Sequence, residues 1–295
     1  MKLIKPSFQI IPQEDLFKHI ELCGRVCYKS EDKITDDSAE KFVNGLIKSG
    51  HTSVLEHGTV YLYFNSISSD DMLDPESTFS VISELNKHGY QRIVPRANEK
   101  EEFIYKEYFI TTNYRFLVEN NLLRLLKYQC ESTAYHKKRV TVKFICDRGV
   151  SHEFVRHRVF SFSQESTRYC NYSKDKFGNE LTFIIPCWTN LPEQEYGDMT
   201  NPKIFNRGSV NGIETDFVNS LRIIEFNYLR LINDGWNPQQ ARQILPNALK
   251  TELVMTGFIE DWKHFFELRT ASNAHPQARE LAIPLMEEFK SLNLI

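Results

Sequence analysis

The stretch that organises this sequence covers residues 140–169 and reads VTVKFICDRGVSHEFVRHRVFSFSQESTRY. Residues 140–146 are rich in β-branched and aromatic side chains and predict a strand. Residues 151–159 predict a helix. The segment after them is dense in hydroxyl and amide groups, which predicts a loop that wraps a phosphate or a base edge. The densest polar chemistry of the chain therefore follows directly on a predicted strand and helix.

Outside this stretch, hydrophobic spacing predicts further helices and strands. Helices are expected over residues 13–27, 37–49 (ended by Gly50), 214–233, 237–256 and 276–291 (begun by Pro276). Strands are expected over residues 59–64 and, as a pair around Thr112-Asn113, over 103–120. Strands in the middle and helices at both ends indicate an α+β fold. Residues 66–101 and 190–212 predict loops rather than linkers, so we expect residues 1–295 to form a single domain.

Composition narrows the class of protein. The 295 residues are 41% hydrophobic, which suits a globular chain, and no apolar run is long enough to span a membrane. The N-terminus does not resemble a secretory signal. Six scattered cysteines indicate reduced thiols and a cytoplasmic location. A net charge of −3 argues against a general nucleic-acid binder, which needs a broad cationic surface.

Several common site motifs are absent from the sequence. It contains no GxGxxG for a dinucleotide crevice, no GxxxxGK[ST] phosphate loop and no GxSxG nucleophile elbow. The histidines lack HExxH spacing, and Cys23 and Cys27 have no matching second pair, so we expect no metal site. The chemistry must therefore come from another kind of site.

The arginines of the 151–169 stretch are the strongest candidates. On a helix, Arg156 and Arg158 would point about 200° apart, so one small ligand could not easily receive both. They could serve two ligands or a partner subunit. Arginine suits phosphate and paired carbonyl acceptors because its fork of donors is rigid. The alternative is a solvated helix end with its cations near the C-terminal dipole.

Four segments in order carry a family resemblance. They are R-H-R-x7-S from Arg156 to Ser166, continuing as S-x-R-Y; Gly50–His57, as GHxxxxEH; Ala241–Pro246, as ARxxLP; and Leu268-Arg269 followed by His275 and Gln277. Together they resemble the flavin-dependent thymidylate synthase family. The resemblance covers residues 1–65 and 140–295, and residues 66–139 look like an insertion that is atypical of the family.

The resemblance implies a central antiparallel sheet flanked by helices, and a homotetramer with sites shared between subunits. It implies dUMP contacts from Glu153, Arg156, Gln164, Glu165, Ser166, Thr167, Arg168, Arg242 and Arg269. It implies FAD contacts from His51, Ser53, Arg156, His157, Arg158, Gln164 and His264. Arg269 would polarise the uracil ring beside N3, and Ser166 would position the substrate; these two are the candidate catalytic residues.

The sequence departs from the family pattern at four positions. Gln164 stands where an acidic residue is common, and Glu153 where a glutamine often reaches dUMP. An acid at 153 would repel a phosphate unless it is paired, for which Arg156 is the candidate. Phe258 and His264 stand where asparagines contact FAD in some members. Tyr169 and Trp188 are interpreted as core residues.

The implied activity is the reductive methylation of dUMP to dTMP. Methylenetetrahydrofolate would donate the carbon, and NADPH-reduced FAD would donate the hydride. Ligands would be dUMP, folate and NADPH, with no nucleic acid and no membrane as partners. Two alternatives stay open: a catalytically inactive homologue, for which Glu153 and Gln164 are the evidence, and a single-stranded nucleic-acid-binding protein.

Overall fold

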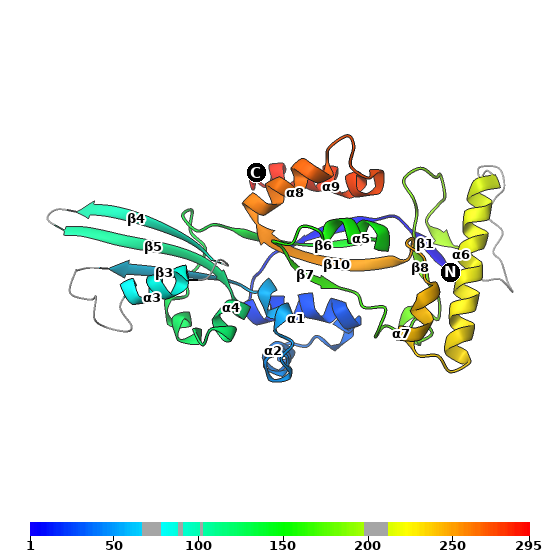
Figure 1. Cartoon of the computed structure of the whole chain (residues 1–295), viewed down its shortest axis with the longest axis horizontal. Coiled ribbons are helices and arrows are strands. Elements are labelled where there is room, and N and C mark those ends of the chain that lie inside the picture. The colour runs from blue at the N-terminus through cyan, green and yellow to red at the C-terminus, as the bar shows by residue number, and fades with distance from the viewer. Residues whose placement is uncertain (67–77, 88–90, 101–102, 198–211) are drawn as a thin grey trace.

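Three sheets lie along the length of an elongated molecule (Figure 1). The structure is a computed structural model that describes residues 1–66, 78–87, 91–100, 103–197 and 212–295. The central sheet has the strand order β2-β6-β10-β7, the outer sheet β3-β5-β4, and the third sheet β8-β1-β9. The chain is therefore α+β, as the order of its elements predicted.

The central sheet is antiparallel throughout and its strands come from distant parts of the chain. They are β2 (Ser7–Ile11), β6 (Arg139–Asp147), β7 (Ser161–Gln164) and β10 (Lys250–Phe258). In the register, Phe144 pairs with Leu253, and Leu253 pairs with Gln164. Residues 140–169 thus supply two of its four strands.

One face of the central sheet is covered by three helices (Figure 1). These are α5 (Arg148–Phe154), α8 (Ile259–Arg269) and α9 (Pro276–Ser291). Because side chains alternate along a strand, Phe144 and Leu253 point into this layer, where the rings of Phe154 and Phe265 lie 5.0 Å apart. Burial of each such ring contributes about 1.5–3 kcal/mol to the free energy of unfolding.

A row of buried polar side chains crosses the opposite face. His19 bonds the hydroxyl of Thr141 (3.0 Å), which bonds Thr256 (2.7 Å); Thr256 bonds His57 (2.8 Å), which bonds Ser163 (3.0 Å). Helices α1 (Leu16–Arg25) and α2 (Ser38–Ser49) lie on this side of the sheet (Figure 1). Burial lowers the pKa of His57 to about 3 and that of His19 to about 4, so both rings are neutral.

Gly257 on β10 allows one aromatic ring to approach the strand closely. A Cβ atom at this position would lie 2.5 Å from the ring of Phe160, which real Cβ atoms do not tolerate. Phe160 also packs against Trp262, with ring centroids 4.7 Å apart. Because residue 257 has no side chain, the ring of Phe160 has room to pack against β10 at this point.

The outer sheet has its own helical cover. Its strands are β3 (Thr59–Ser66), β4 (Arg92–Lys100) and β5 (Phe103–Asn113), and its helices and 3-10 turns are η3 (Thr52–His57), α3 (Thr78–Asn86), α4 (Tyr114–Glu119) and η5 (Leu123–Tyr128). Leu62, Leu85 and Ile110 belong to one core with Ile20 of α1. Arg92 stacks on the ring of Phe258, 4.8 Å away, and so joins this sheet to the end of β10.

The third sheet packs on the longest helix, α6 (Gly212–Asn233). Strand β1 (Lys2–Ile4) pairs in parallel with β8 (Thr182–Ile184) and antiparallel with β9 (Gln194–Glu195). The N-terminal ammonium ion-pairs with Glu225 of α6 at 3.0 Å. The short helix α7 (Pro238–Ala241) and the turn η7 (Arg242–Ile244) follow α6.

Most elements with clear start or stop signals are confirmed. The predicted helices over residues 13–27, 37–49, 214–233 and 276–291 correspond to α1, α2, α6 and α9, and the predicted strands over 59–64 and 140–146 to β3 and β6. Gly50 ends α2 with a positive φ of 71°. All six cysteines are free thiols.

Other predictions are wrong. Residues 103–120 are one strand followed by helix α4, because the Asn113 side chain accepts from the Phe116 N–H and begins a helix there. The helix over 237–256 stops at Leu245, which is extended before Pro246, and strand β10 follows. The predicted loop over 66–101 contains α3 and β4. Residues 67–77, 88–90 and 101 of it, and residues 198–211 of the second predicted loop, lie outside the described residues. Tyr169 and Trp188 are exposed, not core.

Candidate active site

Helix α5 delivers the arginine cluster, but the cluster itself is not helical. The Asp147 carboxylate accepts from the Val150 N–H (2.7 Å) and begins the helix, which ends at Phe154. The helix predicted over 151–159 therefore begins and ends too far along the chain, and Arg156 and Arg158 do not point in the directions that a helix would give them. In the turn that follows, Arg156 and Arg158 are exposed and His157 between them is buried.

Arg269, at the end of α8, lies against the base of this turn. Its Nε donates to Nε2 of His157 (2.9 Å), its Nη1 to the Glu153 carboxylate (2.8 Å), and its Nη2 to the Glu153 carbonyl (2.5 Å). Only 13% of its side chain is exposed. Glu153 and His157 thus hold in a fixed orientation the guanidinium of a residue that is 112 positions beyond His157 in sequence.

His157 is neutral in this arrangement. Burial, followed by the charge of Arg269, lowers the pKa of His157 to about 4. Because a guanidinium can only donate, Nε2 of His157 accepts and the ring carries its proton on Nδ1. The imidazole therefore orients Arg269 without competing with its charge.

Glu153 ion-pairs with two arginines. Besides Arg269, it accepts from Nη1 of Arg156 at 3.2 Å, which is the pairing that an acid at this position required. Partial burial alone would raise the pKa of Glu153, but the hydrogen bond from Arg269 and the charges of both arginines hold it below its usual range. The carboxylate thus stays ionised and is compensated.

The polar segment after the turn begins as a strand. Residues 161–164 form β7, so the predicted loop starts only at Glu165. The side-chain amide of Gln164 donates to the hydroxyls of Ser151 (2.9 Å) and Thr251 (3.2 Å). Gln164 therefore links this segment to α5 and to β10.

Residues 165–168 divide into inward and outward groups. Glu165 and Thr167 are buried, Ser166 is half-buried and Arg168 is exposed. The Ser166 N–H donates to the Cys27 carbonyl (3.0 Å), and its hydroxyl accepts from the Arg168 N–H (3.3 Å). Among the described residues no base bonds the Ser166 hydroxyl, so nothing in this part of the chain activates it as a nucleophile.

The remaining predicted residues lie farther apart. His264 on α8 is exposed, and its ring centroid is 6.2 Å from that of His157, so it belongs to the same cluster. Arg242 is exposed in η7, close in sequence to Gln239, which accepts from Arg168 at 3.3 Å. His51, the residue before η3, and Ser53 on η3 are both exposed and belong to a separate part of the fold.

Sequence reasoning missed two groups of residues near the site. One is His57, which ends the GHxxxxEH segment and bonds Ser163 of β7. The motif contains this histidine, but the sequence indicated no function for it. The other is a set of lysines and glutamates beneath residues 164–168, centred on Lys250. No sequence signal identified Lys250, because its strand was predicted as a helix.

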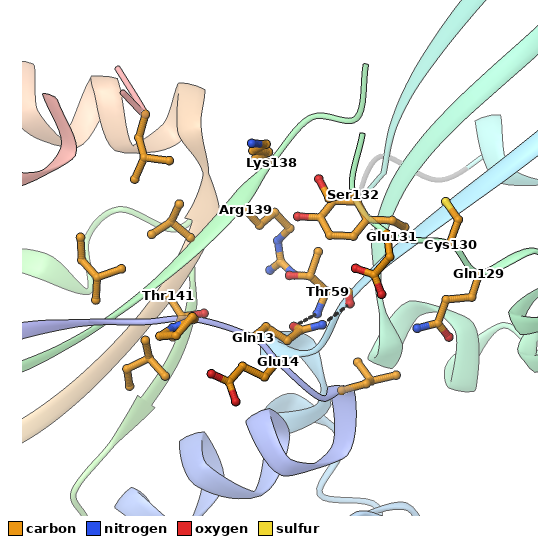
Figure 2. Close-up of a pocket in the computed structure, with 17 residues that line it drawn as sticks. Gln13, Glu14, Thr59, Gln129, Cys130, Glu131, Ser132, Lys138, Arg139 and Thr141 are labelled. Atoms are coloured by element: carbon orange, nitrogen blue, oxygen red, sulfur yellow. Dashed lines mark hydrogen bonds between the residues drawn. The ribbon is translucent and has the colours of Figure 1, made fainter. Parts of the chain in front are cut away.

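A pocket of about 480 Å³ lies between the central and outer sheets (Figure 2). Gln13 and Thr59 bond each other twice along its wall, and the Arg139 guanidinium donates to Ser161 (3.0 Å) and to the Glu56 carbonyl (3.1 Å). Burial lowers the pKa of Arg139 to about 10. The pocket is lined by none of the predicted ligand residues, and Arg139 serves to join η3 to β7.

Two other properties bear on the kind of site. Within the described residues, no three histidine, cysteine, aspartate or glutamate side chains converge as a metal ion requires. No helix in that part of the chain is long and apolar enough to cross a membrane.

Comparisons with known proteins identify relatives of this chain. Flavin-dependent thymidylate synthases from Pyrococcus furiosus and Thermococcus onnurineus are 32% and 30% identical to this chain over 172 residues. Each match covers 58% of this chain and 62% of the relative, so the chain spans about three fifths of these relatives' length.

One solved structure is also similar, the UMP/dUMP methylase PolB from Streptomyces cacaoi bound with 5-Br dUMP. It is 16% identical, with 99% of this chain and 93% of that chain covered, and a TM-score of 0.43 supports no conclusion. The family model for Thy1, the thymidylate synthase complementing protein, matches residues 10–70 and 86–292, which is most of the chain. This protein therefore belongs to the Thy1 family.

Proposed function

We propose that this protein is a flavin-dependent thymidylate synthase. It converts dUMP to dTMP, with methylenetetrahydrofolate as the one-carbon donor and NADPH-reduced FAD as the hydride donor. Family membership and about 30% identity to enzymes of that name support the proposal. The observation that carries it is the fixed guanidinium of Arg269 beside Glu153, Arg156 and His157.

Arg269 is suited to polarise a uracil ring. A guanidinium has five N–H donors, and the three bonds to His157 and Glu153 leave two for a ligand. Because these bonds fix its orientation, the guanidinium need not reorganise as negative charge develops on the ring. We assign Arg269 the electrostatic role in activating uracil.

The segment 164–168 and its neighbours would bind dUMP. Exposed Arg168 and Arg242 and paired Arg156 supply cations for a phosphate. Ser166 would position the substrate with its hydroxyl, and Gln164 and Thr167 would shape the site. Both oxygens of the Glu165 carboxylate are already bonded to Lys250 and Tyr172, so this residue would contribute through its backbone.

The residues also fit FAD. Arg156, Arg158 and His264 are exposed donors beside a buried, neutral His157, an arrangement that suits a pyrophosphate. His51 and Ser53 would add contacts from η3. FAD supplies the hydride chemistry when bound; the protein supplies orientation and charge.

A thiol nucleophile is not part of the proposal. Two cysteines bond the backbone of the segment: the Cys27 carbonyl accepts from the Ser166 N–H (3.0 Å), and the Cys170 N–H donates to the Ser166 carbonyl (2.9 Å). Burial raises the pKa of both thiols, which disfavours the reactive thiolate. This agrees with a route in which Arg269 activates the ring.

We further infer that the sites are completed by neighbouring subunits in a homotetramer. The candidate ligands Arg156, Arg158, Arg168 and Arg242 are exposed on one protomer, so a bound nucleotide would be covered on one side only. Residues 1–295 would act as a single domain. Residues 66–139 would be an insertion outside the catalytic centre, of which the family model leaves out residues 71–85.

The experiment combines spectroscopy with turnover. Purified protein should show a visible flavin spectrum, or gain one on titration with FAD, and should form dTMP from dUMP with both co-substrates. An Arg156→Ala/Arg158→Ala variant should lose FAD affinity. A colourless protein that does not bind FAD refutes the proposal, and salt-sensitive oligonucleotide binding instead would favour the nucleic-acid alternative. Flavin without turnover would indicate an inactive homologue.

A further inference from the structure

A cluster of opposite charges lies beneath the segment 164–168. The Lys250 ammonium is 2.8 Å from the Glu165 carboxylate and 2.7 Å from that of Glu252. Lys29 approaches the same oxygen of Glu252 at 2.8 Å. Lys250 is therefore the link between Glu165 on the segment and Glu252 on β10.

The cluster is shielded from solvent, and Glu252 stays ionised within it. The side chain of Lys250 is 15% exposed and that of Glu165 is 2% exposed. Burial alone would raise the pKa of Glu252, but the charges of Lys250 and Lys29 lower it to about 2. At low exposure such pairs are screened little, so each bond constrains its partners strongly.

The backbone beside the cluster holds the same segment. The Glu165 N–H donates to the Glu252 carbonyl (2.8 Å), and the Ser166 N–H to the Cys27 carbonyl (3.0 Å). Lys29, two residues beyond Cys27, has a positive φ of 47°, which is costly for a residue with a Cβ. The ion pair to Glu252 helps to keep this turn in place.

We propose that Lys250 is a positioning residue, which holds the substrate-binding segment 164–168 in its working conformation through the carboxylate of Glu165. The inference rests on the proposed function, because that segment is where dUMP would bind. Lys250 touches no proposed reacting atom. It acts through Glu165 on the residues that follow, Ser166 to Arg168.

The physical reason is the response of the Glu165 carboxylate to the loss of the Lys250 ammonium. Removing the ammonium takes the ion pair with Lys250 away from the Glu165 carboxylate, which is 2% exposed and lies close to the Glu252 carboxylate; Glu252 keeps its ion pair with Lys29. Glu165 would escape this repulsion by turning toward water. Because its neighbours carry the candidate dUMP contacts, that movement would displace Ser166 and Arg168.

The test compares Lys250→Met with Lys143→Met in the full-length holoenzyme. Lys143 approaches Glu252 at 3.7 Å but, within the described residues, forms no ion pair with Glu165, so it is the matched control. We expect the Kd and KM for dUMP to rise about 10- to 100-fold in Lys250→Met, since a small misplacement costs that much. FAD affinity and the control variant should stay near wild type, and Lys250→Arg should recover most of the loss.

Two further measurements separate positioning from stability. Hydrogen exchange of the amides of residues 165–168, without ligand, should speed up in Lys250→Met and not in Lys143→Met. Adding Glu165→Gln to Lys250→Met should cost little more than either change alone, because both break the same link. If Lys250→Met does not fold, Glu165→Gln alone tests that link.

The possible outcomes separate the positioning role of Lys250 from the proposed function of the protein. An active wild type whose Lys250→Met variant keeps native dUMP binding and amide exchange overturns the positioning role alone. Equal losses of dUMP and FAD binding overturn it too, since they indicate general damage. A wild type that binds neither dUMP nor FAD overturns the proposed function and this inference together.

Discussion

The central and outer sheets are both antiparallel and both covered by helices, yet they differ in the polar side chains that they bury. β10 is buried along nearly its whole length and carries Thr251, Glu252 and Thr256, each bonded to a named partner. β5 of the outer sheet is buried near Asn113 and emerges toward Lys106. None of the predicted ligand residues lies on β3, β4 or β5. A sheet covered on both faces can hold charges and imidazoles in fixed orientations, and the central sheet is the one that carries the candidate site.

The largest loss of turnover is expected on replacing Arg269, which lies on a helix that covers the central sheet. Arg269→Ala should lower turnover by about 10²–10³-fold, the range for losing one preorganised donor in a site. Ser166→Ala should retain measurable activity, because its hydroxyl positions substrate. Steady-state and single-turnover rates of both variants decide this. A dead Ser166→Ala beside a near-native Arg269→Ala would reverse the two roles.

A matched pair of phenylalanines tests whether the sheets differ in function as well as in place. Phe265 packs on His157, with centroids 5.1 Å apart, and Phe64 packs on Tyr128 in the outer sheet at 4.3 Å. Replacement by alanine should cost about 3–5 kcal/mol of unfolding free energy at either position. Only Phe265→Ala should also weaken FAD binding, because it releases His157. Denaturant melts and FAD titrations give both quantities; equal loss of FAD affinity would erase the contrast.

Acid should destabilise the central sheet through its buried histidines. The folded pKa values of His57 and His19, about 3 and 4, lie below the ordinary 6.5. Below pH 6.5 the unfolded chain therefore takes up protons that the folded chain refuses. Stability is complete above pH 6.5 and falls toward pH 4 by about 1.4 kcal/mol per pH unit for each ring. His57→Gln should flatten this dependence in melts between pH 7.5 and 5; an unchanged slope would contradict it.

The smallest effect is expected where the two sheets meet. Arg92 is exposed and stacks on Phe258, so Arg92→Ala should cost about 0.5–1 kcal/mol and leave turnover intact. A thermal melt and a turnover assay measure this. Loss of FAD binding in this variant would mean that the predicted insertion reaches the cofactor site.

Elements with local signals could be predicted from the sequence, and those defined by distant contacts could not. Gly50 and Pro276 identify helix ends by backbone chemistry alone. β10 gave no such signal: its strand is buried on both faces, so it lacks the alternation that identifies a half-exposed strand. The turn after α5 was missed for a similar reason, because helical spacing continues past Phe154 although the helix does not.

In the candidate site too, features with a local sequence signal could be predicted and features that depend on distant contacts could not. The spacing of Arg156, His157 and Arg158 singled out the cluster, and the family resemblance added Arg269 from 112 residues away. The pairing of Glu153 with Arg156 could be expected because the two lie one helical turn apart. The pairing of Lys250 with Glu165 could not be expected, because Glu165 follows β7 and is 85 residues away in sequence, and no local pattern specifies that β7 pairs with β10.

The contact between Gly257 and Phe160 has a consequence for how this protein can evolve. Any side chain at 257 would collide with the ring at 160, so that substitution is excluded while the phenylalanine remains. A smaller residue at 160 would open the space first and make position 257 permissive. The two changes are therefore viable in one order only, and a lineage that has filled 257 can regain phenylalanine at 160 only by first reverting to glycine.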